Sequence, residues 1–279
     1  ARLAESYLAQ ARAVRYSRRS GQRFEALEAI RQAREISGPT PALAQEAVAA
    51  LGLADMVVAR TWNGFPPGTL EIAFDPALEK YARSDVQGRI SLRRVSDDAE
   101  IAVLASGIPP AGYRGLEFSP DGRWLHVLGG RGPSARAQLY RIDLVPPQLV
   151  LDGRHFAFAF SPDSRQLAVG QQDGSVRLLD TASGRELRRL AVRLPVRDFA
   201  YLWWNPRRPQ LAVNLRSGWS ILDLDRDELQ PPLPMPVSWL AWHPDGRHLA
   251  VSTDQRLTIE IFDAQSRKRV VPLALGHKD

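Results

Sequence analysis

Histidine is the residue in this chain best suited to metal binding or acid–base chemistry, because imidazole binds metals and titrates near neutral pH. The five histidines are His126, His155, His243, His248 and His277. None belongs to an H-E-x-x-H pattern, which places two zinc ligands on one helical face. His243 and His248 flank a turn and fall in different registers. We therefore expect no metal site.

Other patterns that could support a reaction or hold an ion are incomplete. The acidic stretch Asp223–Asp227 is similar to the start of a calcium loop, but Glu228 occupies the position that requires glycine and Pro234 the one that requires glutamate. The sequence has no phosphate loop, no His-Arg-Asp or Asp-Phe-Gly, and no G-x-S-x-G nucleophile elbow. It also has no cysteine, which excludes thiol nucleophiles and thiolate metal sites. We expect no catalytic residue and no cofactor.

The aromatic side chains are candidates for binding, because tryptophan is enriched in interface hot spots. Trp204 and Trp242 occupy equivalent apolar positions and should lie in the core. Trp203 and Trp239 have the opposite parity, so they should face a neighbouring unit or a central channel. There we favour core packing over a platform for a ligand. Trp219 begins a later strand, where we expect an exposed anchor.

Three arginines form a second candidate surface. Arg114, Arg154 and Arg197 each precede a predicted first strand in successive units, so they should lie on one rim of the molecule. A rim of arginines could engage acidic partners, although isolated rim charges usually contribute little.

A sequence repeat positions these residues. An aromatic residue, a polar residue and proline recur before a turn, at successive spacings of 44, 42, 44 and 38 residues. The copies are FDPALEKYARS from Phe74, FSPDGRWLHVL from Phe118, FSPDSRQLAVG from Phe160, WNPRRPQLAVN from Trp204 and WHPDGRHLAVS from Trp242. Self-similarity at this period indicates a repeat architecture.

Each copy reads as four short strands joined by turns rich in glycine, proline and aspartate, without interleaved helices. Such units predict a mainly β fold, a β-propeller of four-stranded antiparallel blades. We expect blades at about 69–105, 113–152, 155–192, 197–230 and 237–275. With five motifs, the ring is either incomplete or closed by the strand MVVARTW from Met56 to Trp62.

The N-terminal stretch has helical periodicity instead, with apolar residues every three positions at Leu8, Ala11 and Val14, and again from Phe24. Thr40 followed by Pro41 suits the start of a third helix. We therefore expect an α-helical linker segment over residues 1–53 and the propeller over 54–279.

Composition supports an ordinary globular protein. Of the 279 residues, 44% are apolar, and 37 basic against 31 acidic residues give a net charge of +6. The basic excess is spread along the chain, whereas a nucleic-acid footprint needs a concentrated stripe, so we expect no nucleic-acid partner. No apolar run is long enough to span a membrane.

The repeat resembles the WD-repeat propellers. The F-S-P-D-G turn and the spacing match that family, and the third strands end in pairs such as Leu179-Asp180, where the family often has Trp-Asp. Asp173 matches the family's strand-joining aspartate, whereas Gly-His occurs only at Gly276-His277, so the family's buried hydrogen-bond network is not expected in a complete blade.

Residues 1–105 resemble a more specific class of propeller-containing proteins. YLAQARA and GQRFEALEAI, followed by EAVAALGLADMVVARTW, look like the segment joining kinase to propeller in planctomycete-type bacterial serine/threonine kinases. That resemblance implies an upstream kinase domain and an upstream membrane tether.

These observations together predict a non-catalytic module for protein interaction or sensing, with a protein or peptide partner. One alternative is an enzyme or small-molecule binder with its site in the axial channel. Carboxylates or histidines converging on that channel would favour it. The other alternative is a purely architectural spacer.

Overall fold

The computed structural model divides into two compact units, Ala1–Phe65 and Pro66–Asp279. The expected closing strand Met56–Trp62 lies outside the described residues, apart from Met56. The structure describes residues 2–56, 65–104, 106–107, 113–129, 136–155, 157–171, 173–194, 199–215, 217–235, 237–253 and 258–273.

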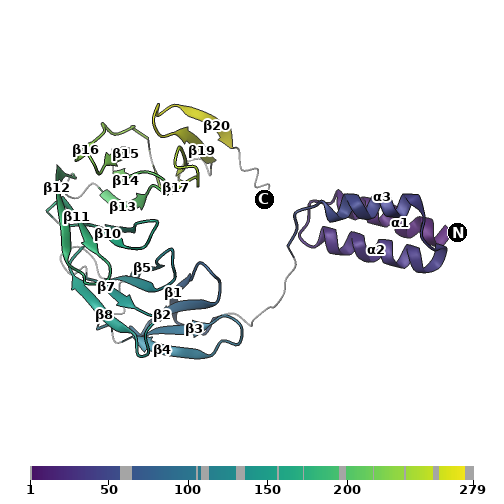
Figure 1. The fold of residues 1–279 in the computed structure, drawn as a ribbon, viewed down its shortest axis with the longest axis horizontal. Helices are drawn as coiled ribbons and strands as arrows, with labels where there is room; N and C mark the ends of the chain where they lie inside the picture. The colour runs from purple at the N-terminus through teal and green to yellow at the C-terminus, as the bar shows by residue number, and fades with distance from the viewer. Residues whose placement is uncertain are drawn as a thin grey trace. The chain divides into compact units, whose positions relative to one another are not determined.

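The first unit consists of three helices, α1 (Arg2–Arg15), α2 (Gln22–Ser37) and α3 (Pro41–Leu51), which confirms the helical prediction (Figure 1). The Thr40 side chain accepts a hydrogen bond from the Leu43 N–H at 3.3 Å and so caps α3. The helices pack mainly through alanines, whose small side chains let the backbones approach closely. Within the described residues, no helix combines the length and the apolar character that crossing a membrane requires.

A buried carboxylate also joins two of these helices. Glu46 on α3 is only 5% exposed and lies 2.6 Å from Arg15 Nε and 3.4 Å from Arg12 Nε, both on α1. Two guanidinium groups compensate the buried charge, as burial of a carboxylate demands.

The second unit consists of five four-stranded antiparallel sheets, numbered here as blades 1 to 5, and this confirms the predicted β-propeller fold. In each blade the strands pair in the order in which they occur along the chain. The first strand of each blade lies innermost and the fourth outermost (Figure 1). The bounds are β1 (Thr69–Phe74), β2 (Lys80–Asp85), β3 (Ile90–Arg94) and β4 (Glu100–Leu104) in blade 1; β5 (Tyr113–Phe118), β6 (Trp124–Gly129), β7 (Arg136–Arg141) and β8 (Gln148–Gly153) in blade 2; β9 (Ala157–Phe160), β10 (Gln166–Gly170), β11 (Ser175–Asp180) and β12 (Glu186–Arg193) in blade 3; β13 (Phe199–Trp204), β14 (Gln210–Leu215), β15 (Gly218–Asp223) and β16 (Glu228–Leu229) in blade 4; and β17 (Trp239–Trp242), β18 (His248–Thr253), β19 (Thr258–Asp263) and β20 (Arg269–Leu273) in blade 5.

The repeated motif forms the turn between the first and second strands. In blade 2 the Ser119 hydroxyl donates to Asp121 Oδ1 at 2.5 Å, and that oxygen accepts the Arg123 N–H at 3.1 Å. Gly122 has a φ of +68°, the left-handed conformation that glycine adopts without strain. The polar and glycine positions of the motif are therefore the ones that the turn requires.

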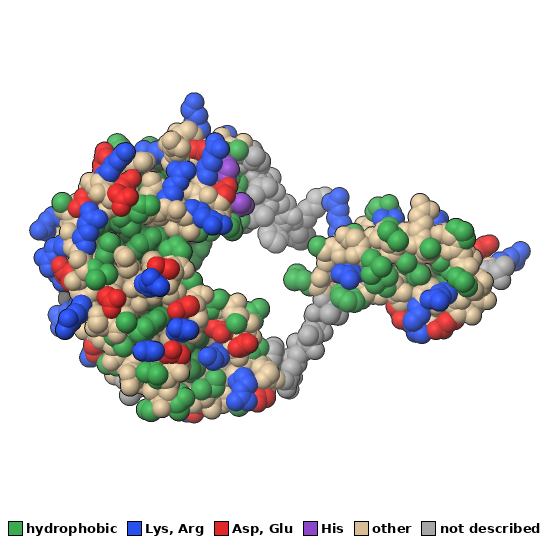
Figure 2. Space-filling view, in the orientation of Figure 1, with side chains coloured by type: hydrophobic (Ala, Val, Ile, Leu, Met, Phe, Trp, Pro, Cys, Tyr) green, Lys and Arg blue, Asp and Glu red, His purple; other side chains and the backbone are tan. Residues whose placement is uncertain are grey.

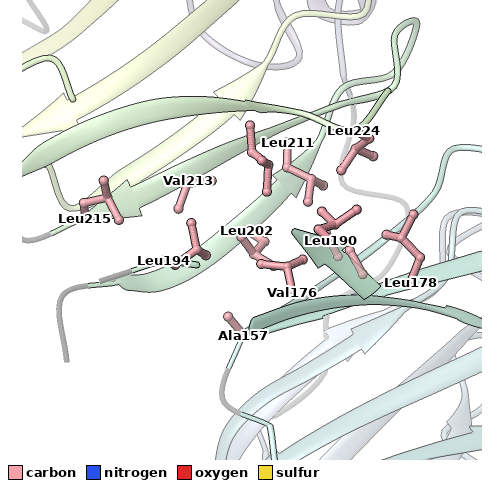
Figure 3. Packing of buried hydrophobic residues seen from close by; sticks show 13 residues of the cluster. Ala157, Val176, Leu178, Leu190, Leu194, Leu202, Leu211, Val213, Leu215 and Leu224 are labelled. Atoms are coloured by element: carbon pink, nitrogen blue, oxygen red, sulfur yellow. The ribbon is translucent and has the colours of Figure 1, made fainter. Parts of the chain in front are cut away.

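Hydrophobic clusters join consecutive blades. The cluster between blades 3 and 4 includes Leu178 and Leu190 on one side and Leu202 and Leu211 on the other (Figure 3). Comparable clusters join blades 1 and 2, 2 and 3, and 4 and 5. Full burial of one leucine contributes about 1.5–3 kcal/mol, so each interface makes a large favourable contribution to the stability of the fold. The innermost strands are thereby held against one another.

Candidate functional site

Of the three candidate arginines, the structure describes only one side chain. Arg154 is exposed in the segment between β8 and β9. Arg197 and the side chain of Arg114 lie outside the described residues. The predicted arginine rim therefore stays a prediction.

The expectation that Trp219 is exposed is wrong, because its side chain is fully buried. The segment that follows β16 crosses over it: Leu233 N–H donates to Trp219 O at 2.7 Å, and Trp219 N–H donates to Leu233 O at 3.2 Å. The indole ring packs edge to face on Phe262 of blade 5, with centroids 5.5 Å apart. Trp219 is thus part of the core between blades 4 and 5.

Trp203 and Trp239, by contrast, lie together at the innermost strands of blades 4 and 5. Their ring centroids are 5.5 Å apart, and Tyr201 lies 5.7 Å from the first and 5.5 Å from the second. Trp239 is 55% exposed and Tyr201 42% exposed, although both carry large apolar surfaces. We call these three residues the aromatic cluster.

The innermost strands fix the position of this cluster. Tyr201 and Trp203 alternate along β13, so both point to the same face of the strand, toward blade 5. The Trp242 indole N–H donates to the backbone oxygen of Trp203 at 3.0 Å, which ties β17 to β13 directly beside the cluster.

A pocket of about 410 Å³ opens beside the aromatic cluster. The innermost strands of blades 2 to 5 line it, with Glu117 from β5, Phe160 from β9, Trp203 from β13 and Trp239 from β17. Figure 2 shows hydrophobic side chains gathered on the inner side of the five blades. A concave, mostly apolar surface with few polar groups is the usual form of a binding site.

Glu117 is the carboxylate of this pocket. Its side chain is exposed at the pocket surface, and desolvation by the surrounding protein raises the pKa of Glu117 to about 7. On the neighbouring inner strand β1, desolvation also raises the pKa of Glu71, opposed by a hydrogen bond from the backbone of Leu116. The pocket therefore combines aromatic faces with a carboxylate that titrates near neutral pH.

A larger groove of about 510 Å³ lies between blades 3 and 4, but two of the arginines that line it already have partners in the fold. Arg188 donates to Leu224 O and to Asp227 Oδ1, each at 2.6 Å. Arg207 Nε donates to Pro244 O at 3.1 Å. Since these guanidinium groups serve the fold, the pocket beside the aromatic cluster is the better candidate for binding.

Sequence reasoning missed Glu117 and Tyr201, although the repeat contains a signal for the first. The residue just before the motif aromatic is alanine in blades 1, 3 and 5, but glutamate in blade 2 and tryptophan in blade 4. The two departures, Glu117 and Trp203, line the same pocket. At this one position, blades 2 and 4 therefore place large side chains in the pocket, whereas blades 3 and 5 place alanine there.

Comparison with protein families identifies the repeat. Residues 152–180 and 233–259 match the WD domain, G-beta repeat. The first match begins near the end of β8 and ends with β11, so one sequence repeat combines the outer strand of one blade with three strands of the next.

Two curated proteins are similar to this chain. WD repeat-containing protein VIP3 of Arabidopsis thaliana is 27% identical over 168 residues, 55% of this chain and 52% of that protein. WD repeat-containing protein SL1-17 of Schistosoma mansoni is 31% identical over 120 residues, 42% of this chain and 39% of that protein. The chain therefore spans about half or less of the relatives' lengths.

Proposed function

We propose that this chain, a β-propeller with WD40 repeats, is a non-catalytic interaction module that binds a protein or peptide partner at the aromatic cluster. The observation that carries the proposal is the exposure of Trp239 and Tyr201 at the edge of a pocket, where burial by a partner would be favourable. WD-repeat similarity supports a protein partner.

The chemistry of the pocket favours a cationic group on that partner. Aromatic faces attract cations through their quadrupole, and such contacts contribute about 0.5–2 kcal/mol. Glu117 adds a negative charge when ionised. A lysine or arginine side chain inserted from a partner segment would contact both features, so we expect a peptide with a basic residue to bind here.

The test uses short peptides with one central lysine or arginine, and a matched peptide with glutamine at that place. We expect the basic peptides to bind the intact chain and to quench tryptophan fluorescence. Trp239→Ala should weaken binding by about tenfold or more, as loss of a hot-spot tryptophan does. Equal binding of the glutamine peptide, or unchanged binding by the variant, would refute the proposal.

A small-molecule or hydrolytic function of the same pocket is the second candidate. The observation in its favour is that desolvation raises the pKa of Glu117 to about 7, since a carboxyl group with a near-neutral pKa suits general acid catalysis. Desolvation also raises the pKa of Glu71 on the adjacent inner strand. Generic ester and glycoside substrates test it. Turnover that disappears in Glu117→Gln would support an enzyme, and no turnover together with retained peptide binding would support the interaction module.

Our finer proposal places this propeller in a membrane-tethered bacterial serine/threonine kinase, as a docking or sensing part used in signalling. It is supported by the sequence resemblance over residues 1–105 and by three helices where that resemblance implies a helical linker. The intact mass of the native gene product tests it. A large product with kinase signature peptides upstream would support the assignment, and a product near 31.0 kDa would contradict it.

A further inference from the structure

The turn between β17 and β18 has histidine at two positions where the other four blades have none. Blade 3 has Ser161 in the second motif position and Gln166 at the start of its second strand, whereas blade 5 has His243 and His248 in those places. The motif aspartate, Asp245 in blade 5, is shared. Blade 5 thus keeps the frame of the turn and adds two imidazoles.

Backbone N–H groups of the turn bind one carboxylate oxygen of Asp245, and the other oxygen faces side chains. Oδ1 accepts the backbone N–H groups of Arg247 at 2.7 Å and His248 at 3.0 Å. The motif aspartates of blades 2 and 3, Asp121 and Asp163, likewise accept the N–H of the residue two positions later. Oδ2 instead faces the two imidazoles, 2.7 Å from His248 Nδ1 and 3.1 Å from His243 Nδ1. In the described part of the chain, this is the group of three metal-ligating side chains whose ligand atoms all lie within 4.8 Å of one another.

The side chain of His243 also lies against the Asp245 carboxylate. Its Nδ1 lies 3.2 Å from the backbone N–H of Asp245, a donor, and 3.1 Å from Asp245 Oδ2, an acceptor. When Nδ1 carries the proton it donates to Oδ2, and when the proton is on Nε2 the Nδ1 atom accepts the N–H. A divalent cation can replace the proton between Nδ1 and Oδ2, with both atoms as its ligands.

The turn is also held rigidly, which lowers the cost of assembling a site. Asn205 of blade 4 donates to Gly246 O at 2.9 Å, and Arg207 donates to Pro244 O at 3.1 Å. Arg247, the nearest cation in sequence, is drawn away by Asp263, 2.6 Å from its Nε. The three ligands therefore stand on a fixed turn, and no guanidinium is paired with Asp245 among the described residues.

We infer that His243, Asp245 and His248 bind a divalent transition-metal ion, with Zn²⁺ as the best match. Two imidazole nitrogens and one carboxylate oxygen form a zinc ligand set, with bonds of about 2.0–2.2 Å and hence about 3.4 Å between ligand atoms. The observed separations need only small side-chain adjustments. Histidine side chains reach the surface of the five-blade unit near β17 and β19 (Figure 2).

The geometry also predicts an open coordination position. The side chains of His243, Asp245 and His248 are 63%, 38% and 31% exposed, so the rest of the coordination shell faces solvent. Water would complete the zinc coordination in the free protein, and a ligand atom from a binding partner could replace it. Pro244, between two of the ligands, also lines the pocket beside the aromatic cluster.

The experiment is isothermal titration of the untagged intact chain with Zn²⁺, because a histidine tag would bind the metal itself. We expect one equivalent of Zn²⁺ and a higher melting temperature with metal. His243→Ser with His248→Gln gives blade 5 the residues that blade 3 has at these two positions, and should abolish both effects. His243→Ser alone should weaken binding by at least about tenfold.

A reciprocal variant tests the geometry separately from the residues. In the background without the two histidines, Ser161→His with Gln166→His places the same ligand set beside Asp163. We expect it to restore one equivalent of Zn²⁺. No binding by the parent chain, or undiminished binding by the His243→Ser/His248→Gln variant, would overturn the inference. Neither result bears on peptide binding at the aromatic cluster, which Trp239→Ala tests alone.

Discussion

Two aromatic groups in this propeller each lie at a border between neighbouring blades, but they differ in exposure. Between blades 2 and 3, His126 stacks on Phe158 with ring centroids 3.5 Å apart and contacts His155 at 2.8 Å between the Nε2 atoms, and both imidazoles are buried. Between blades 4 and 5, Trp239 and Tyr201 are largely exposed. The first group belongs to the core, and the second is available to a partner.

The difference shows how a repeat protein separates stability from binding. Both groups are built on the same strand–turn–strand frame, and both hold planar side chains in contact across a blade interface. Only the group whose burial is incomplete has surface left for a ligand. Substitutions in the two groups should therefore give opposite results in folding and binding assays.

The largest effect is expected from His126→Ala. Removal of a fully buried ring leaves a cavity, and it leaves His155 Nε2 without the hydrogen bond that it has in the parent chain. We expect the free energy of unfolding to fall by about 2–4 kcal/mol, measured by urea denaturation. Peptide binding under native conditions should be unchanged. A loss below about 1 kcal/mol would mean that this group is not part of the stabilising core.

The same pair should make stability depend on pH. Burial lowers the pKa of His155 from 6.5 to about 4, and burial with repulsion from His155 lowers the pKa of His126 well below 6.5. Because the folded state favours neutral imidazoles, stability is complete above pH 6.5 and is lost as the pH falls from 6.5 toward 4. For His155 alone the loss is on the order of 3 kcal/mol. His155→Gln should flatten this part of the pH profile, and an unchanged slope would contradict the assignment.

Trp239→Ala provides the opposite pattern. Because the side chain is 55% exposed, its loss should change the free energy of unfolding by less than about 1 kcal/mol. Binding of the basic peptide should fall by about tenfold or more. Fluorescence anisotropy with a labelled peptide measures the binding, and urea denaturation serves as the control. A large loss of stability would place Trp239 in the core instead.

Glu117→Gln sharpens the comparison by removing charge alone. The parent carboxyl, with a pKa of about 7, is ionised above pH 7 and neutral below it, so binding of a cationic peptide should weaken as the pH falls through 7. The variant should bind more weakly at pH 8, by about 1 kcal/mol or less, and show no such pH dependence. A parallel pH dependence in both proteins would mean that another group is responsible.

The smallest effect is expected from Trp219→Phe. The indole nitrogen of Trp219 is buried without a hydrogen-bond partner in the described structure, so phenylalanine removes an unsatisfied donor as well as some apolar surface. These contributions oppose each other, and we expect the free energy of unfolding to change by about 1 kcal/mol or less. Peptide binding should not change. A binding defect would show that the interface extends beyond the aromatic cluster.

The sequence predicted the five sheets because the repeat specifies its own local structure. The proline, aspartate and glycine of the motif indicate a turn, and the apolar runs on either side of it indicate strands. Trp203 and Trp239 could be chosen by parity, since side chains alternate along a strand. The contact of Trp239 with Tyr201 depends on how closely blades 4 and 5 pack, and the sequence of neither blade specifies this distance.

Trp219 shows where this reasoning fails. A strand-initial tryptophan looks exposed if the outer strand of its blade is assumed to be regular. In blade 4 that strand, β16, has only two residues, and the proline-rich segment after it pairs with Trp219 through Leu233. Gly218 permits this approach, because a Cβ there would lie 1.9 Å from Leu233 O. Because proline is unfavourable in strands, the sequence did not predict that the segment containing Leu233 pairs with Trp219 and covers it.

The hydrophobic clusters described above each connect one blade to the next along the chain, and none in the described structure connects blades distant in sequence. The energy of such a fold is close to a sum over units and their borders. A duplication of about forty residues therefore adds one unit and one border without rebuilding the rest. In evolutionary terms the repeat is the unit of duplication, and a binding group such as the aromatic cluster can arise at one border between blades while the other borders keep the fold.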